Sequence, residues 1–396
     1  MKITTVSNYI NHHQIPLSNA LYQVLGEEYH FIQTEPMEEE RIKMGWGQLV
    51  KDCPYLCCFY EQAEACRRLI LDSDIVIFGG VEDESYIEER LALGKIVIRS
   101  SERIYKAGQW RAVSPRGLKK KYHDHMRYRK APVYLLCNGG YVASDFHIIR
   151  AYPNKMFRWG YFPQTYHYQI AQLMAAKPQD IMEIVWVGRF IHVKQPEYVL
   201  RLARQLARDQ IRAHITIIGG GELKEKISNC IEKERLQDVI TMTGFKNPTE
   251  VRSYMERSNI SIATSQYWEG WGAVINEAMN SGCAVVASHA MGATPYLIQD
   301  GVNGLIYRNE DFHEFYACVK KLILDRDLRQ RLGRAAYETI TTVWNAENAA
   351  QQLLKLCTQL CDGVEDYYAP EGPISKAPIV APGRMYHYLK THAKKQ

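Results

Sequence analysis

The stretch Ile260-Ser-Ile-Ala263, followed after five residues by Glu269-Gly-Trp-Gly-Ala-Val-Ile-Asn-Glu277, decides the fold. The run 260–263 predicts a strand covered on both faces. Residues 273–280 predict a helix that Ser281-Gly282 ends. Gly270 and Gly272 remove side chains where the backbone turns from strand into helix. A buried strand that enters a helix through such a turn is the repeating unit of an α/β protein with a parallel sheet.

Similar units fill most of the 396 residues, about twice the length expected of one domain. Because Pro178 breaks the helical pattern before it, we predict two facing Rossmann-like domains with parallel sheets, residues 1–177 and 178–345. A C-terminal helix and Pro-rich tail, residues 346–396, are predicted to pack back on the first domain. The expected strands are Ile3–Val6, His30–Gln33, Ile75–Phe78, Ile96–Ile98 and Val133–Leu136, then Ile184–Val187, Ile215–Ile218, Ile240–Met242, Ile260–Ala263 and Ala284–Ala287.

Composition excludes several classes of protein. Apolar residues make up 46% and charged residues 23%, which is ordinary globular usage and excludes a disordered or fibrous chain. No apolar run reaches the ~18 residues of a membrane span, and the first residues lack the apolar stretch of a signal peptide. The ten cysteines have no zinc-site spacing. We therefore expect a cytoplasmic protein with free thiols and no metal site.

The residues around the deciding stretch favour an anion. The backbone N–H groups of Trp271, Gly272, Ala273 and Val274 precede the helix, whose macrodipole favours negative charge there. Glu269 and Glu277 would flank such an anion and accept hydrogen bonds from hydroxyl groups. Gly188-Arg189 closes another strand, and Lys194 follows five residues later. A guanidinium and an ammonium at the carboxyl edge of a parallel sheet predict a diphosphate site.

Six motifs in this order resemble the C-terminal domain of the family 4 retaining glycosyltransferases, which have the GT-B fold. They cover roughly residues 180 to 345. The run Met291-Gly292-Ala293-Thr294-Pro295-Tyr296 departs from the family, because a tyrosine stands where relatives often have a glutamate. The motifs are Gly188-Arg189 with Lys194; Gly219-Gly220-Gly221-Glu222; Thr243-Gly244-Phe245; Glu269 and Glu277; Ala278-Met279 with Gly282 and 284–287; and Asp300-Gly301-Val302-Asn303-Gly304-Leu305.

The resemblance implies a role for each matching residue. Arg189 and Lys194 would bind the donor diphosphate and stabilise the charge that develops on it. Glu269 would hold hydroxyls of the transferred sugar, and Glu277 those of the ribose. The backbone of Gly244 and Phe245 would meet the base of the donor, a nucleotide-diphosphate sugar that is UDP- or GDP-linked. Gly188 and the residues Gly270, Trp271, Gly272, Ala273 and Val274 complete the implied donor site. No cofactor and no metal are implied.

The first domain matches the family less closely. The usual glycine-rich loop after the first strand is replaced by Asn8-Tyr-Ile-Asn-His-His-Gln14. By position, His12, His13, Ser101 and Glu102 follow strands and are expected at the same sheet edge, where they would orient donor or acceptor. We include His13 among the candidate catalytic residues. If the family mechanism holds, the leaving phosphate takes the acceptor's proton and the anomeric configuration is retained.

The segment 103–130 holds ten Lys or Arg residues and one acid. Aromatic residues are interleaved with these cations, and a helix over 118–130 would be basic and only weakly apolar. Three interpretations stay open: contact with an anionic membrane, which we favour, a solvated face, and nucleic acid, which no recognition motif supports. Membrane contact would place the protein peripherally at the inner face.

We predict a hexosyltransferase-type enzyme that moves a sugar from a nucleotide-diphosphate donor to a hydroxyl acceptor. The expected acceptor is a surface polysaccharide or a lipid-linked glycan. The alternatives are a nucleotide-sugar epimerase of the same fold, which would need no acceptor, and a catalytically degenerate protein that only binds a sugar nucleotide.

Overall fold

The computed structural model describes residues 1–39, 50, 52–81 and 85–392, and within these no helix is long and apolar enough to cross a membrane. The chain divides into two compact units. Unit 1 comprises Met1–Gln164 and Val343–Ala381, and unit 2 comprises Thr165–Thr342 and the residues from Pro382 onward. The chain therefore passes between the units three times.

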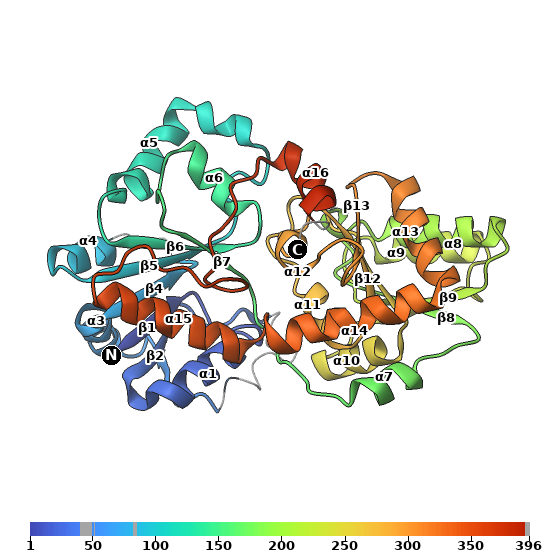
Figure 1. The fold of residues 1–396 in the computed structure, drawn as a ribbon, viewed down its shortest axis with the longest axis horizontal. Coiled ribbons are helices and arrows are strands. Elements are labelled where there is room, and N and C mark those ends of the chain that lie inside the picture. Colours follow the sequence, from blue (N-terminus) through green and yellow to red (C-terminus); the bar gives the residue numbers. More distant parts are fainter. Residues whose placement is uncertain (40–49, 51, 82–84, 393–396) are drawn as a thin grey trace. The chain divides into compact units, whose positions relative to one another are not determined.

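Unit 1 is built on a seven-stranded parallel sheet in the order β3-β2-β1-β4-β5-β6-β7. The order reverses direction between β1 and β4, and such a switch point opens a crevice at the carboxyl ends of the strands. Figure 1 shows α6 on one side of this sheet and α1 and α15 on the other. The strands are β1 (Ile3–Ser7), β2 (Tyr29–Gln33), β3 (Leu56–Cys58), β4 (Ile75–Gly79), β5 (Ile96–Ser101), β6 (Val133–Asn138) and β7 (Met156–Trp159). The helices are α1 (Ile15–Leu25), α3 (Ala63–Asp72), α4 (Ser85–Ala92), α5 (Pro115–Asp124), α6 (Val142–Ile148) and α15 (Ala346–Cys361).

Unit 2 repeats the arrangement with six parallel strands in the order β10-β9-β8-β11-β12-β13. Its switch point lies between β8 and β11. One face of the sheet forms a continuous apolar core with α8, α9 and α13. The strands are β8 (Met182–Val187), β9 (Ala213–Ile218), β10 (Ile240–Gly244), β11 (Ile260–Ala263), β12 (Ala284–Ser288) and β13 (Leu305–Tyr307). The helices are α7 (Ile170–Ala176), α8 (Glu197–Arg208), α9 (Lys224–Lys233), α10 (Pro248–Arg257), α11 (Val274–Asn280), α12 (Thr294–Leu297), α13 (Phe312–Leu324), α14 (Arg326–Thr342) and α16 (Pro382–His392).

All ten predicted strands are present, and the α/β fold with two parallel sheets is confirmed. Three strands were not predicted: β3, β7 and β13. Each has only three or four residues, and β7 carries the half-exposed Arg158 in its middle. Such short runs lack the length by which buried strands are told from loops.

The second unit begins at Thr165, whereas the sequence predicts a second domain that begins at Pro178. The segment between them bonds to helices of unit 2. The backbone N–H of Tyr166 donates to Asn280 Oδ1 (2.8 Å), and that of Tyr168 donates to the Tyr337 hydroxyl (2.8 Å). Helix α7 does end before Pro178, as a helix should.

The tail after α15 divides between the units. Along β7 it runs antiparallel: the N–H of Ile374 donates to Arg158 O (2.9 Å), and the N–H of Ala377 donates to Met156 O (3.1 Å). The tail thereby covers an edge strand, which would otherwise expose unpaired backbone groups. From Pro382 the chain forms α16, which belongs to unit 2. In this division residues 343–381 thus form part of unit 1, whereas the residues from Pro382 onward form part of unit 2.

The predicted helix over 118–130 is wrong in both of its bounds. Helix α5 spans Pro115–Asp124, starts at a Ser114 cap and ends where the backbone of His125 turns to φ −139°. His125 turns inward, because its Nδ1 lies 2.9 Å from the Tyr152 hydroxyl and its ring meets Phe146 edge-on. A buried histidine thus ends a helix that the charge pattern would have continued.

Lys177 gives a test of how unit 2 is held together. Its side chain is buried, and its Nζ donates to the carbonyl oxygens of Met255, Glu256, Ser258 and Ser281 at 2.7–3.3 Å. Lys177→Met keeps the apolar stem but removes the four hydrogen bonds to these carbonyls, so we expect the free energy of unfolding in urea to fall by roughly 3 kcal/mol. Lys233→Met, at an exposed position of α9, is the control and should change stability by less than about 0.5 kcal/mol. Equal losses in both variants would contradict this account.

Candidate functional site

Two loops at the carboxyl edge of the unit 2 sheet pack backbone against backbone. A Cβ on Gly219, whose φ is +135°, would lie 2.0 Å from the carbonyl oxygen of Gly188. The N–H of Phe190 donates to Gly220 O (2.8 Å), and Phe190 O accepts from the N–H of Leu223 (2.9 Å). Glycine is therefore required after β9, because any side chain at 219 would push the loop after β8 away.

A second pair of loops meets in the same way. A Cβ on Gly292 would lie 1.8 Å from the carbonyl oxygen of Gly270, and one on Gly272, whose φ is +93°, would lie 2.5 Å from Met291 Cε. The N–H of Ala293 donates to Trp271 O (2.9 Å). The loop after β11 is thus seated on the loop after β12, and its glycines serve close packing as well as turning.

Lys194 joins the two pairs of loops, because its ammonium forms an ion pair with the carboxylate of Glu269. The backbone supports this pairing. Lys194 O accepts from the Thr264 hydroxyl (2.6 Å), which in turn accepts from the Trp186 indole N–H (2.8 Å). Both charged side chains keep 15–18% of their surface exposed, so a ligand can reach them.

Arg189 lies on the same loop as Lys194, at an exposed position. Within the described part of the chain its guanidinium has no ion-pair partner. Further along the edge, the N–H of Gly219 donates to Gly244 O (2.9 Å), which fixes the chain just before Phe245. The Phe245 side chain is 54% exposed. The edge therefore presents an aromatic ring, then a cation, then the Lys194–Glu269 pair.

Glu277 lies in the first turn of α11 and is partly buried. Burial raises the pKa of its carboxyl group, and the nearby Arg252 opposes that rise. The first N–H of this turn that bonds back is that of Ile275, to Gly272 O (3.0 Å). The preceding N–H groups, of Gly272, Ala273 and Val274, belong to the unbonded start of the helix.

All the candidate residues of unit 2 thus follow strands β8, β10 or β11 at one sheet edge. Trp271 is fixed there by its buried indole, which donates to Asn276 Oδ1 (2.8 Å). The set comprises Gly188, Arg189, Lys194, Gly244, Phe245, Glu269, Gly270, Trp271, Gly272, Ala273, Val274 and Glu277.

In unit 1 the histidines and Glu102 are linked by a residue that sequence reasoning missed, Tyr161. Its hydroxyl donates to Glu102 Oε1 (2.6 Å), and its ring lies parallel to that of His13 with centroids 6.0 Å apart. Lys106 Nζ lies 2.6 Å from the other oxygen, Glu102 Oε2. The carboxylate thus holds a tyrosine and a lysine. No sequence signal identified Tyr161, because it follows β7, which was not predicted.

The other two candidates of unit 1 sit beside these groups. His12 and His13 have ring centroids 3.7 Å apart, and their loop is fixed by the side chain of Asn11, which accepts from the N–H of His13 (3.0 Å). The Ser101 hydroxyl donates to the backbone carbonyl of Glu102 (2.8 Å). His12, His13, Ser101 and Glu102 therefore lie at the carboxyl ends of β1 and β5.

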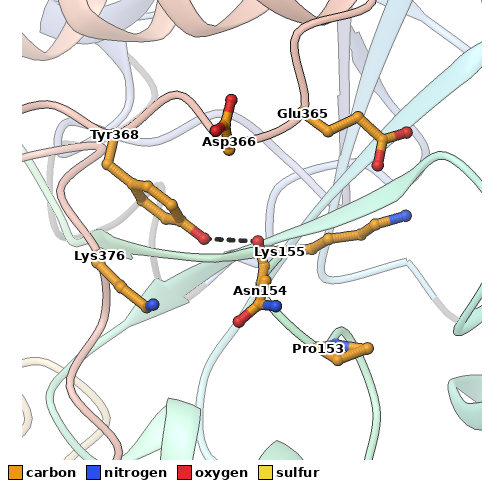
Figure 2. Close-up of a pocket in the computed structure, with 7 residues that line it drawn as sticks. All are labelled: Pro153, Asn154, Lys155, Glu365, Asp366, Tyr368 and Lys376. Atoms are coloured by element: carbon orange, nitrogen blue, oxygen red, sulfur yellow. Dashed lines mark hydrogen bonds between the residues drawn. The ribbon is translucent and has the colours of Figure 1, made fainter.

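A pocket in unit 1 lies at the opposite end of its sheet. Figure 2 shows it between the loop before β7 and the returning tail, with the Tyr368 hydroxyl donating to Asn154 O (2.5 Å). Because Asn154 and Lys155 precede β7, this pocket is at the amino edge, away from the candidate residues. It is lined by Pro153, Asn154, Lys155, Glu365, Asp366, Tyr368 and Lys376.

Two α/β units with parallel sheets, each with its candidate polar groups at the carboxyl edge, define a protein of the GT-B class. HepE of Anabaena, crystallised in complex with UDP, has this fold: its TM-score is 0.66 at 13% identity, over 91% of this chain and 100% of HepE. Residues 175–339 match the family model described as "Glycosyl transferases group 1". The match of these residues to the family model confirms the resemblance read from the motifs of this part of the chain.

Curated relatives match less than half of this chain. The alpha-D-kanosaminyltransferase of Streptomyces kanamyceticus is 28% identical over 170 residues, 43% of this chain and 44% of the relative. The poly(glycerol-phosphate) alpha-glucosyltransferase of Bacillus subtilis is 23% identical over 195 residues, 49% of this chain and 28% of the relative. The chain thus spans less than half the length of these two relatives.

The loop packing predicts that substitution of two neighbouring glycines changes the stability of unit 2 by very different amounts. Gly219→Ala should destabilise unit 2 by roughly 2–4 kcal/mol in urea unfolding, because the new methyl group would overlap the carbonyl of Gly188 in a strained backbone. Gly220→Ala is the matched control, since a Cβ there meets nothing within 4 Å. Its stability should stay within about 0.5 kcal/mol of the parent chain. Similar losses at both positions would show that the loops do not depend on this close approach.

Proposed function

We propose that the chain is a retaining hexosyltransferase that moves a sugar from a nucleotide-diphosphate donor to a hydroxyl acceptor. The observation that carries this proposal is the pairing of Lys194 with Glu269 at the carboxyl edge of unit 2, with Arg189 on the same loop. A cation beside a carboxylate suits a ligand that has a phosphate next to a hydroxyl-rich ring. The group 1 glycosyltransferase match of residues 175–339 supports the same chemistry.

The order of groups along the sheet edge suits an extended sugar nucleotide. Strands β10 and β11 are separated by β9 and β8, which places their ends about 14 Å apart at ~4.8 Å per strand. In the proposed complex the base meets Gly244 and Phe245, and Glu277 binds the ribose hydroxyls. Arg189 and Lys194 bind the diphosphate. The base is uracil in our first choice, because HepE was crystallised with UDP; a GDP-linked sugar is the alternative.

Transfer in this proposal occurs on one face of the sugar. The bond between the anomeric carbon and the diphosphate oxygen breaks, and the acceptor oxygen forms the new bond on the same side. The acceptor's proton passes to the leaving phosphate oxygen, while Arg189 and Lys194 stabilise its negative charge. Glu269 holds the hydroxyls of the transferred sugar during this step. Both curated relatives are named for alpha-linked products, which supports retention.

The proposed acceptor is a surface polysaccharide or a lipid-linked glycan, reached at an anionic membrane face. The structure narrows the basic segment on which this rests, because Arg103 pairs with Asp145, Lys106 with Glu102, and Arg127 with Glu88. The exposed cations lie on α5 and the 3₁₀ turn before it, where Lys120 pairs with Asp124, and at Arg129 and Lys130. On α5 and that turn, Trp110, Val113 and Tyr122 are 59–77% exposed beside Arg111, Arg116, Lys119 and Lys120. Exposed aromatic and apolar groups among cations favour the interface of an anionic bilayer.

Donor binding tests the main proposal. UDP and GDP sugars are titrated into the purified chain by calorimetry, and turnover is followed as released nucleotide diphosphate with and without an acceptor. We expect the Glu269→Ala, Lys194→Ala double variant to lose at least about a hundredfold in turnover, because it removes the contacts to the sugar and the leaving phosphate.

Lys226→Ala, on the exposed side of α9, is the charge control and should keep full turnover. A fully active double variant would refute the assignment. Conversion of the sugar without any acceptor would favour the epimerase, and binding without any turnover would favour the degenerate binding protein.

Membrane contact has its own test. Sedimentation with phosphatidylglycerol-containing vesicles should capture the chain at low salt, and phosphatidylcholine vesicles should not. The Lys119→Ala, Lys120→Ala variant should bind about thirtyfold more weakly, at ~1 kcal/mol per cation. The matched control, Lys224→Ala with Lys226→Ala, removes two exposed lysines of unit 2 and should bind as the parent chain does. Equal binding to both vesicle types, or preference for DNA, would contradict the membrane interpretation.

A further inference from the structure

His289, which follows β12, connects the candidate sugar-binding loop to the C-terminal helix. Its ring is 4% exposed, and its Nε2 lies 2.7 Å from the hydroxyl of Tyr267. Tyr267 precedes Glu269 by two residues in the loop after β11, and the N–H of Glu269 donates to Gln266 O (3.0 Å). His289 therefore touches the turn that carries the carboxylate.

The hydrogen bonds of His289 fix its tautomer. The backbone N–H of Asn309 donates to His289 Nδ1 (2.9 Å), so that nitrogen carries no proton. In the neutral ring the proton is then on Nε2, which donates to the Tyr267 hydroxyl. Burial lowers the pKa of His289 to about 4, so the ring is neutral and this pattern holds at ordinary pH.

Helix α16 packs against the other side of this histidine. The Tyr386 ring meets the His289 ring at 71°, with centroids 5.4 Å apart. The helix is anchored there by charge, because Lys390 Nζ lies 3.1 Å from both Asp300 Oδ2 and Glu314 Oε1. The Tyr386 hydroxyl donates to the same Glu314 carboxylate. Figure 1 shows α16 beside β13, the strand that neighbours β12.

We propose that His289, held by Tyr386 of α16, is a positioning residue for the transferred sugar: through its Nε2–H it fixes Tyr267 and with it the turn that presents Glu269. The inference rests on the proposed function, in which Glu269 holds the sugar. It adds residues outside the family-like motifs, and it gives the C-terminal helix a role in donor recognition. Binding of the sugar moiety should depend on the contact between His289 and Tyr267. Binding of the nucleotide, near β8 and β10, should not depend on it.

Two substitutions of His289 separate its two hydrogen bonds. Asparagine places a polar atom near the position of Nδ1, so His289→Asn keeps an acceptor for Asn309 and loses the donor to Tyr267. Glutamine reaches the position of Nε2, so His289→Gln keeps the donor and loses the acceptor. If His289 only stabilised the fold, the two substitutions would change the affinity for the sugar moiety by the same factor.

The measurement compares the Kd of UDP with that of UDP-glucose, and the KM with the kcat of the transfer reaction. We expect His289→Asn and Tyr267→Phe each to weaken UDP-glucose binding about tenfold, the value of one hydrogen bond, while UDP binding changes less than about twofold. The double variant should be no worse than either single one, because both remove the same bond. His289→Gln should remain within about threefold of the parent chain.

Helix α16 offers a matched pair of aromatic residues. Tyr386→Ala should weaken UDP-glucose binding as Tyr267→Phe does. Tyr388→Ala should not, because this ring stacks on His392 with centroids 4.1 Å apart instead of on His289. Unchanged UDP-glucose binding in Tyr267→Phe, or equal losses in His289→Gln and His289→Asn, would overturn the inference alone. A parent chain that gains affinity from the sugar moiety of none of the UDP and GDP sugars would overturn the proposed function as well.

Discussion

The pairing of Lys194 with Glu269 depends on backbone contacts that only glycine permits. A Cβ at Gly219 or at Gly292 would lie within 2.0 Å of a carbonyl oxygen of the neighbouring loop. Because closely packed backbones cannot shift independently, the cation and the carboxylate are held at a set separation before any ligand arrives. A preorganised pair of this kind needs little rearrangement when a ligand binds. More of the electrostatic interaction energy therefore contributes to the affinity.

The candidate site of unit 2 could be predicted because parallel topology turns sequence position into spatial position. Every strand of such a sheet ends at the same edge, so residues that follow strands, such as Arg189 and Glu269, must gather there. In unit 1 the same reasoning placed His13 and Glu102, yet it missed Tyr161, which links them. Tyr161 follows a four-residue strand that contains an arginine, and neither length nor periodicity distinguishes such a strand from a loop.

The charge pattern predicted less of the structure than the strand pattern did, because the sequence does not show whether a cation is buried. Arg103 counts toward the basic segment, but its side chain is 4% exposed and pairs with Asp145, 42 residues away. Lys177 has its ammonium among backbone carbonyls, which no charge count reveals. The basic surface is therefore smaller than the composition suggests. Its exposed part lies on α5 and the turn before it, beside the exposed ring of Trp110, and continues at Arg129 and Lys130.

The proline-rich tail shows how composition and structure can differ. Prolines favour disorder when nothing else orders the chain, yet here they alternate with residues that bond to unit 1. The N–H groups of Ile374 and Ala377 donate to the edge strand β7, and Pro373 and Pro378 stand next to them without a donor to satisfy. The tail thereby covers an edge strand without burying unpaired N–H groups.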